Sequence, residues 1–244
     1  SERCTSNCLQ TIGGTSFRGC SSLTEITIPE SVQSIGSHAF ADCYSIPSIF
    51  IPKNVRSIGP GITSTSGRGF ASIVVDKDNP YYDSRDNCNA IIHTATNKLI
   101  SDGENSIIPA SVTSLGDWVF YDRDKTELVI PDQIPYIGTG AFGAWFKLEK
   151  LTIPASVNTI IGQAFRYAWK LKEVYVENKV PIDIKGVFYD VNLKNVTLYV
   201  PYGCKAAYEA ADYWKEFKEI IEMDGENSLY ANDVTVRPCV QKTV

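Results

Sequence analysis

One phrase occurs twice in this chain. Residues 23–40 read LTEITIPESVQSIGSHAF, and residues 148–165 read LEKLTIPASVNTIIGQAF. Repetition of this kind constrains the fold strongly, because a short unit that cannot bury its apolar side alone must stack on copies of itself. The period of the repeat is therefore the first property to establish.

Three columns of residues mark the repeat: an Ile-Pro pair, a phenylalanine and a glycine. Wherever copies adjoin, the members of a column lie 22 or 23 residues apart. A long gap between Ile51 and Ile108 interrupts the series. The columns are Ile28, Ile51, Ile108, Ile130 and Ile153, with a worn copy at Val200; Phe17, Phe40, Phe120, Phe142, Phe165 and Phe188; and Gly13, Gly36, Gly59, Gly116 and Gly138.

Each unit is expected to form two short extended segments and a corner. The first segment alternates apolar and polar residues, as in a strand with one buried face. It ends at Pro29, which has no N–H to donate to a ladder. The second segment carries Val32 and Ile35 inward, and the corner after Gly36 places Phe40 inside. The columns therefore predict the interior of the molecule.

Stacked units of this length predict a mostly β, α/β solenoid with parallel strands. Neighbouring coils would lie roughly 4.8 Å apart, so about nine coils would give a body on the order of 40 Å long. Like residues would lie above like, and the Phe column would be buried.

The phrase in residues 21–43, SSLTEITIPESVQSIGSHAFADC, resembles the repeat of the BspA-type leucine-rich repeat family. The resemblance covers roughly residues 12–223. It implies a right-handed leucine-rich-repeat superhelix that is secreted or attached to a bacterial surface. It also implies a module for adhesion or protein binding, with a host extracellular-matrix or mucosal protein as partner.

The expected organisation has three parts: an N-terminal segment at 1–11, a solenoid at 12–223, and a tail at 224–244 that can begin a following domain. An inserted, hairpin-like unit is expected to project from the solenoid at 76–105, where turn residues flank the apolar pieces AII and KLI. A capping helix is expected at 203–222, since Ala207, Ala211, Trp214 and Ile221 share one helical face.

Several classes of function find no support in the composition. The net charge is −5 and no basic block occurs, so nucleic acid is not an expected partner. No apolar run reaches the ~18 residues that a membrane span requires. Seven cysteines include no Cys-x-x-Cys pair, which argues against zinc. The acidic residues of the insertion lack the spacing of a calcium loop; these are Asp76, Asp78, Asp83 and Asp86.

No catalytic group is expected, and no metal or cofactor. Cys88 and His93 form a conceivable nucleophilic pair, but no orienting residue or oxyanion motif accompanies them. Cys20 and Cys43 occupy the same site in adjacent coils and would lie close enough to bond, whereas the family resemblance implies buried free thiols. A pairing of Cys4 with Cys8 stays open. We expect a monomeric, non-enzymatic protein.

The candidate ligand-binding residues lie on the outer face of the first segment. The residue before each marker points away from the core, and these residues are largely β-branched or aromatic. That row is Thr27, Phe50, Val74, Ile107, Val129, Thr152, Tyr175 and Tyr199. Two positions earlier lie four charged candidates, Glu25, Glu127, Lys150 and Glu173, and the three glutamates would favour basic or polar ligands.

Four hypotheses remain for this row and its surroundings. Strands prefer β-branched and aromatic residues in any case, so the row can be purely structural. It can also be a recognition surface, because solenoids present extended concave faces and Tyr and Phe are favoured anchors. The alternatives are a structural spacer in a larger surface protein and a carbohydrate-binding module that uses Trp118, Trp145 and Trp169.

Overall fold

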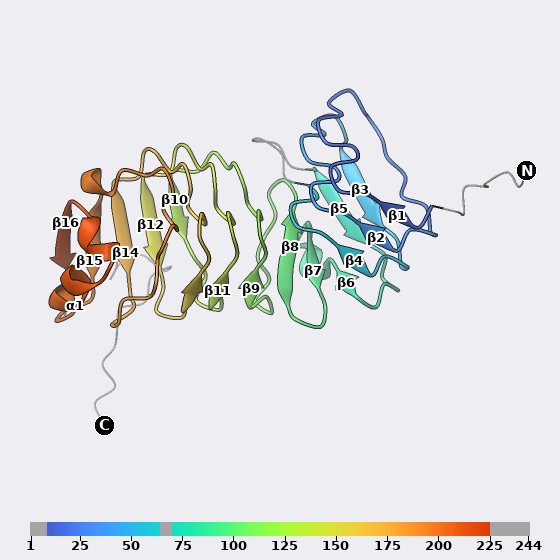
Figure 1. Ribbon diagram of the computed structural model, residues 1–244. Coiled ribbons are helices and arrows are strands. Elements are labelled where there is room, and N and C mark those ends of the chain that lie inside the picture. Colours follow the sequence, from blue (N-terminus) through green and yellow to red (C-terminus); the bar gives the residue numbers. More distant parts are fainter. Residues whose placement is uncertain (1–8, 64–69, 225–244) are drawn as a thin grey trace, which may run out of the picture.

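The computed structural model describes residues 9–63 and 70–224, and it has the predicted solenoid architecture of about nine turns (Figure 1). Short strands stack along the body, and the few helical segments lie mostly at the C-terminal end. Two expectations fall outside the described residues: the pairing of Cys4 with Cys8, and the tail at 224–244 apart from Asp224.

The first segments of the coils form one layer of parallel strands. In the described residues this layer consists of two sheets. One is the pair β3 (Ser48–Ile51) and β5 (Ser72–Val75); the other runs in the order β10 (Glu127–Val129), β12 (Lys150–Ile153), β14 (Glu173–Val176), β15 (Thr197–Val200) and β16 (Glu219–Glu222).

The second segments form the other layer, which is also divided in two. Its first sheet contains β1 (Thr11–Ile12), β2 (Ser34–Ile35) and β4 (Ser57–Ile58). Its second sheet runs in the order β13 (Thr159–Ile160), β11 (Tyr136–Ile137), β9 (Ser114–Leu115), β8 (Lys98–Asp102), β7 (Ala90–His93) and β6 (Tyr82–Asp83). The divisions of both layers fall at the long gap in the repeat.

Pairing across the coils places equivalent residues opposite each other. Leu151 pairs with Val174, and Ile153 pairs with Val176. All four side chains are buried. The predicted register, with like residues above like, is therefore confirmed.

The phenylalanine column is interior, as the repeat predicted. Phe120, Phe142, Phe165 and Phe188 stack in series, with neighbouring ring centroids 5.6–5.7 Å apart. All four are buried, and Phe142 is 2% exposed. At the C-terminal end the column meets Phe217, whose ring lies edge-on to Phe188 at 5.8 Å. The column is thus a continuous spine through the second half of the solenoid.

The inserted unit contains the predicted hairpin, but the hairpin does not project. Strands β7 and β8 pair antiparallel, and β8 then pairs in parallel with β9 of the next coil. Ile91, Ile92 and Leu99 are fully buried. Their burial is the physical reason for the correction, because a projecting hairpin would leave these side chains in water. Figure 1 shows β7 and β8 between the two stacks of coils.

The C-terminal cap is shorter than the predicted helix at 203–222. An α-helix, α1, covers only Lys205–Ala210, and a 3-10 turn, η3, follows at Trp214–Glu216. Residues Glu219–Glu222 form β16, which pairs in parallel with β15. Edge pairing satisfies the backbone groups of β15, which a helix could not do. Tyr208 and Trp214 fill the cap and donate to the carbonyls of Asn178 and Ile182, each at 2.7 Å.

Candidate functional site: the exposed strand row and the groove beside it

The N-terminal part of the candidate row is exposed. Phe50 is 46% exposed, Val74 45% and Ile107 54%. Phe50 and Val74 lie directly opposite each other on β3 and β5. Their neighbours Ile49, Ile51 and Ile73 are buried, which is the alternation expected of strands with one face on the core. The sequence therefore identified an apolar surface correctly in this half.

The C-terminal part of the row is covered, contrary to expectation. Thr152 is 2% exposed and Tyr175 5%, while Val129 and Tyr199 are half-buried. The Tyr175 ring stacks on Tyr199, with centroids 4.3 Å apart and an interplanar angle of 4°. The ammonium of Lys150 lies 5.1 Å from the centre of the same ring. Tyr175 is therefore held by its own neighbours on adjacent strands and does not present a free aromatic face.

The charged residues of the C-terminal strands mainly contact one another. Lys150 forms an ion pair with Glu127 at 3.2 Å, and the Tyr175 hydroxyl donates to Glu173 at 3.0 Å. Glu25 lies apart from this group, in the coil that contains β2, and is exposed. The structure thus brings Glu127, Lys150, Glu173 and Tyr175 together, but as a network whose charges are already engaged.

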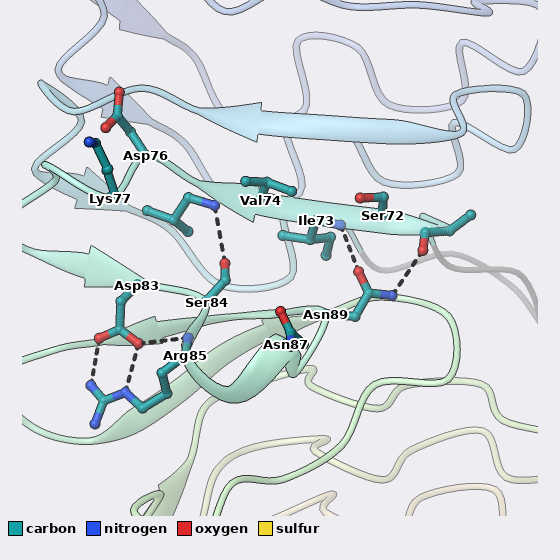
Figure 2. Close-up of a pocket in the computed structure, with 12 residues that line it drawn as sticks. Ser72, Ile73, Val74, Asp76, Lys77, Asp83, Ser84, Arg85, Asn87 and Asn89 are labelled. Carbon is teal, nitrogen blue, oxygen red and sulfur yellow. Dashed lines mark hydrogen bonds and ion pairs between the residues drawn. The ribbon is translucent and has the colours of Figure 1, made fainter.

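A groove lies between β5 and residues 83–89 of the insertion (Figure 2), with a volume of about 550 Å³. The groove forms because the segment after β6 is not a strand and cannot pair with β5. Side chains of this segment accept hydrogen bonds from β5 where a neighbouring strand would otherwise do so. Asn89 Oδ1 accepts from the Ile73 N–H at 2.6 Å, and Ser84 Oγ accepts from the Val75 N–H at 3.1 Å. The outer edge of β5 is therefore closed by polar side chains, which also line the groove.

Asn89 connects three segments of the chain. Its amide nitrogen donates to the carbonyls of Ala71 at 3.2 Å and Glu104 at 2.7 Å. The N–H of Ile107 in turn donates to the Cys88 carbonyl at 3.1 Å. The inserted segment thus occupies the position between β5 and residues 106–108, so that Ile107 lies beyond the groove from Val74. The sequence analysis did not single out Asn89; its only signal was an Asn-rich insertion.

One wall of the groove carries a compact charge network. Arg85 donates to Asp83 through Nε at 2.7 Å and through Nη2 at 2.5 Å, and Thr94 also donates to Asp83 at 2.8 Å. Burial acts to raise the pKa of Asp83, but the hydrogen bonds from Arg85 and Thr94 outweigh it and lower the pKa overall. Asp83 is therefore an ionised acceptor that holds Arg85 in place at neutral pH.

The Cys88–His93 pair does not have the features of a catalytic site. Burial raises the pKa of the Cys88 thiol, which disfavours the thiolate that a nucleophile needs. His93 Nδ1 lies 2.8 Å from the Thr96 hydroxyl. Cys20, Cys43 and Cys88 are free thiols. Among residues 9–63 and 70–224, no three His, Cys, Asp or Glu side chains gather closely enough to hold a metal ion.

The repeat sequence matches that of a known family. The BspA type Leucine rich repeat region matches residues 4–67 and 98–205, in six copies. The chain belongs to the BspA-type leucine-rich repeat family. Proteins of this family are bacterial surface proteins. The described part of this BspA-type protein contains no helix with the length and apolar character of a membrane span.

Solved structures of bacterial leucine-rich repeat proteins share the fold. A leucine-rich cell surface protein from Faecalibacterium prausnitzii is 19% identical, with a TM-score of 0.55 over 91% of this chain. The pneumococcal vaccine antigen PcpA is 18% identical, with a TM-score of 0.52 over 88% of this chain. The chain spans 60% and 66% of those two proteins. No curated protein sequence matches.

The insertion lies largely outside the repeats that define this family. The family match stops at residue 67 and resumes at residue 98, so it omits β5 and the groove residues Asp83, Ser84, Arg85 and Asn89. The groove is therefore built by sequence outside the matched repeats, whereas the coils on either side are built by the common repeat.

Proposed function

We propose that the chain is a non-enzymatic protein-binding module that uses the exposed strand row in its N-terminal half. The observation that carries this proposal is the exposure of three large apolar side chains: Phe50 and Val74 on the paired strands β3 and β5, and Ile107 beyond the groove. Scattered apolar residues need no explanation, but Phe50 and Val74 lie opposite each other on paired strands and provide an apolar surface that a partner can cover.

The groove supplies the polar contacts that such a surface needs. It lies between Val74 and the inserted segment, and Arg85, Asn87 and Asp83 line it. Protein interfaces typically combine an apolar centre with a polar rim, and aromatic residues and arginine are enriched among their anchors. Phe50 would serve as the apolar anchor, and the groove would orient the partner through hydrogen bonds.

The remaining parts of the proposal concern location and partner. We propose that residues 12–223 act at the surface of a bacterium, as a monomer, on an extracellular-matrix or mucosal protein of a host. Membership of the BspA-type family supports the surface location. The similar protein from Faecalibacterium prausnitzii is a leucine-rich cell surface protein, which supports the same location. The candidate residues on the C-terminal strands have a smaller role in this proposal, because their side chains contact one another. These residues are Glu127, Val129, Lys150, Glu173, Tyr175 and Tyr199.

The test is a binding screen of the purified chain against immobilised matrix proteins and mucins. Two variants are compared with the unmodified protein. The first combines Phe50→Ala, Val74→Ala and Ile107→Ala on the exposed N-terminal part of the row, and the second combines Glu127→Ala and Tyr199→Ala on the C-terminal strands. We expect binding that is lost in the first variant and kept in the second. Loss in the second alone would move the site to the C-terminal half. Binding to none of the proteins would contradict the proposal and favour the spacer hypothesis.

A further inference from the structure

A second aromatic surface lies on the corners of the C-terminal coils, away from the strand row. Trp169 is 61% exposed and Tyr189 54%. Tyr167 contacts both rings, with centroids 5.7 Å from Trp169 and 6.3 Å from Tyr189. Phe146 extends the surface, since its ring lies 5.0 Å from Trp169. We call these four residues and Arg166 the corner cluster.

The three corner tryptophans differ in their environments. Trp145 is buried, and its indole N–H donates to the Phe120 carbonyl at 2.6 Å, so it is a core residue. Trp118 is half-buried and packs against Gly140, where a Cβ would lie 2.5 Å from the indole ring. Trp169 alone of the three has a largely exposed ring, and the Asp190 carboxylate fixes its indole N–H at 3.2 Å. The ring is thus both exposed and oriented.

Arg166 is a cation inside this aromatic surface. Its guanidinium carbon lies 4.2 Å from the Tyr167 ring centre, 5.6 Å from that of Trp118 and 5.9 Å from that of Tyr189. It donates to two neutral acceptors, Gln163 Oε1 at 2.8 Å and the Tyr167 hydroxyl. Its Nε is buried and has no hydrogen-bond acceptor among the described residues.

Within the described part of the chain, Arg166 forms no ion pair with a carboxylate. Every ion pair found in residues 9–63 and 70–224 involves other basic side chains. Cation–π contacts offset part of the cost of removing the guanidinium from water. A guanidinium has five N–H donors in a planar fork that fits a carboxylate, and hydrogen bonds between charged partners are stronger than neutral ones. The site therefore favours an incoming anion.

We propose that the corner cluster binds a carboxylated sugar. The carboxylate would bond to Arg166, and a pyranose ring would stack on the exposed face of Trp169 or Tyr189. The face of an aromatic ring is negative, so it attracts the slightly positive C–H groups on the flat side of a sugar. An acidic peptide would satisfy Arg166 equally well but makes no comparable use of two exposed ring faces.

The experiment compares sialyllactose with lactose, which is the same sugar without the acidic residue. Binding to the full chain is measured by saturation-transfer NMR and calorimetry. We expect sialyllactose to bind about tenfold more tightly than lactose, which corresponds to one charge-assisted contact. Arg166→Gln should reduce the affinity for sialyllactose to that for lactose, and Trp169→Ala should weaken both.

The controls separate this proposal from the strand-row proposal and from misfolding. Phe50→Ala should leave sugar binding unchanged, and the melting temperature of each variant shows whether it is folded. Arg166→Lys keeps the charge but not the planar fork, so it should bind sialyllactose at an intermediate level. Equal affinity for the two sugars, no binding of either, or binding of a glutamate-rich peptide in place of sialyllactose would each overturn the proposal.

Discussion

Ile91 and Ile92 are consecutive residues, both fully buried, yet they belong to different hydrophobic cores. Ile91 packs with the N-terminal coils and Ile92 with the C-terminal coils. The pairing of β7 with β8 shifts register between them. Strand β7 therefore separates the two cores and contributes a side chain to each, so mutating Ile91 and Ile92 separately tests the two cores.

We expect Ile91→Ala and Ile92→Ala each to lower the free energy of unfolding by about 2–5 kcal/mol, because each leaves a cavity. The two variants should weaken different regions. In hydrogen-exchange mass spectrometry, Ile91→Ala should lower protection mainly in β3 and β5, and Ile92→Ala mainly in β9 and β11. The same loss of protection across the whole solenoid in both variants would contradict the two-core arrangement.

The Phe column predicts a large effect at its centre. Phe142 stacks on Phe120 and Phe165 at once. Phe142→Ala should therefore cost about 3–5 kcal/mol in urea unfolding. The exposed Phe50 is the matched comparison, and Phe50→Ala should change stability by no more than about 0.5 kcal/mol. A small effect at Phe142 would mean that its neighbours close the cavity.

The ion pair between Asp102 and Arg123 is the most buried one in the described residues. Asp102 also accepts from the Phe120 N–H at 3.0 Å. Asp102→Ala should cost about 3–5 kcal/mol, because it removes the counter-ion of Arg123 and the acceptor of the Phe120 N–H in a poorly hydrated place. Asp124, which pairs with Lys147 at 2.9 Å on the surface, is the control. Asp124→Ala should cost less than about 1 kcal/mol, and equal costs would refute this account.

Asp83 should make the stability of the groove depend on pH. Its pKa is lower in the folded protein than the value of about 3.9 that an unfolded chain has. Its contribution is therefore present above pH ~4 and is lost as the pH falls through the folded pKa. Asp83→Asn should destabilise the protein at neutral pH, and this difference should shrink in acid. Thermal melts of both proteins between neutral pH and about pH 3 measure it; a constant difference would contradict the prediction.

The thiols of adjacent coils should differ in reactivity. Cys20 is exposed, whereas Cys43 is buried and donates to the Phe17 carbonyl at 3.0 Å. Burial raises the pKa of Cys43, so little thiolate forms. Iodoacetamide at mildly alkaline pH should label Cys20 in the folded protein and reach Cys43 only after unfolding. Peptide mapping measures both sites, and a Cys20–Cys43 disulfide in the map would contradict the free-thiol arrangement.

The repeating part of the fold was predictable because periodicity reports burial directly. The spacing of Phe142 and Phe165 predicted the spine, and the Ile-Pro pairs located the end of each first strand. The outward direction of Phe50 and Val74 also followed from simple alternation. These inferences needed only the assumption that like residues stack on like.

The rest depended on contacts that no period encodes. Tyr175 has the same place in its repeat as Phe50, but its burial depends on Tyr199 and Lys150, which lie on other coils. Trp145 and Trp169 both lie in corners, yet the Trp145 ring is buried, where its N–H donates to the Phe120 carbonyl, and the Trp169 ring is exposed. Residues 219–222 suited a helical face equally well, and the unpaired edge of β15 selected the strand.

The last strand of the hairpin, β8, pairs with the following coils in the normal register of the repeat. Lys98 and Leu99 pair with Ser114 and Leu115, which in turn pair with Tyr136 and Ile137 in the ordinary register of the repeat. Because the insertion ends in the register of the repeat, its length does not change the strand pairing of the coils that follow. For a protein engineer, the turn at residues 94–97 is accordingly a place to graft a foreign loop, with β7 kept for the two cores and β8 kept as the strand at which the regular coils resume.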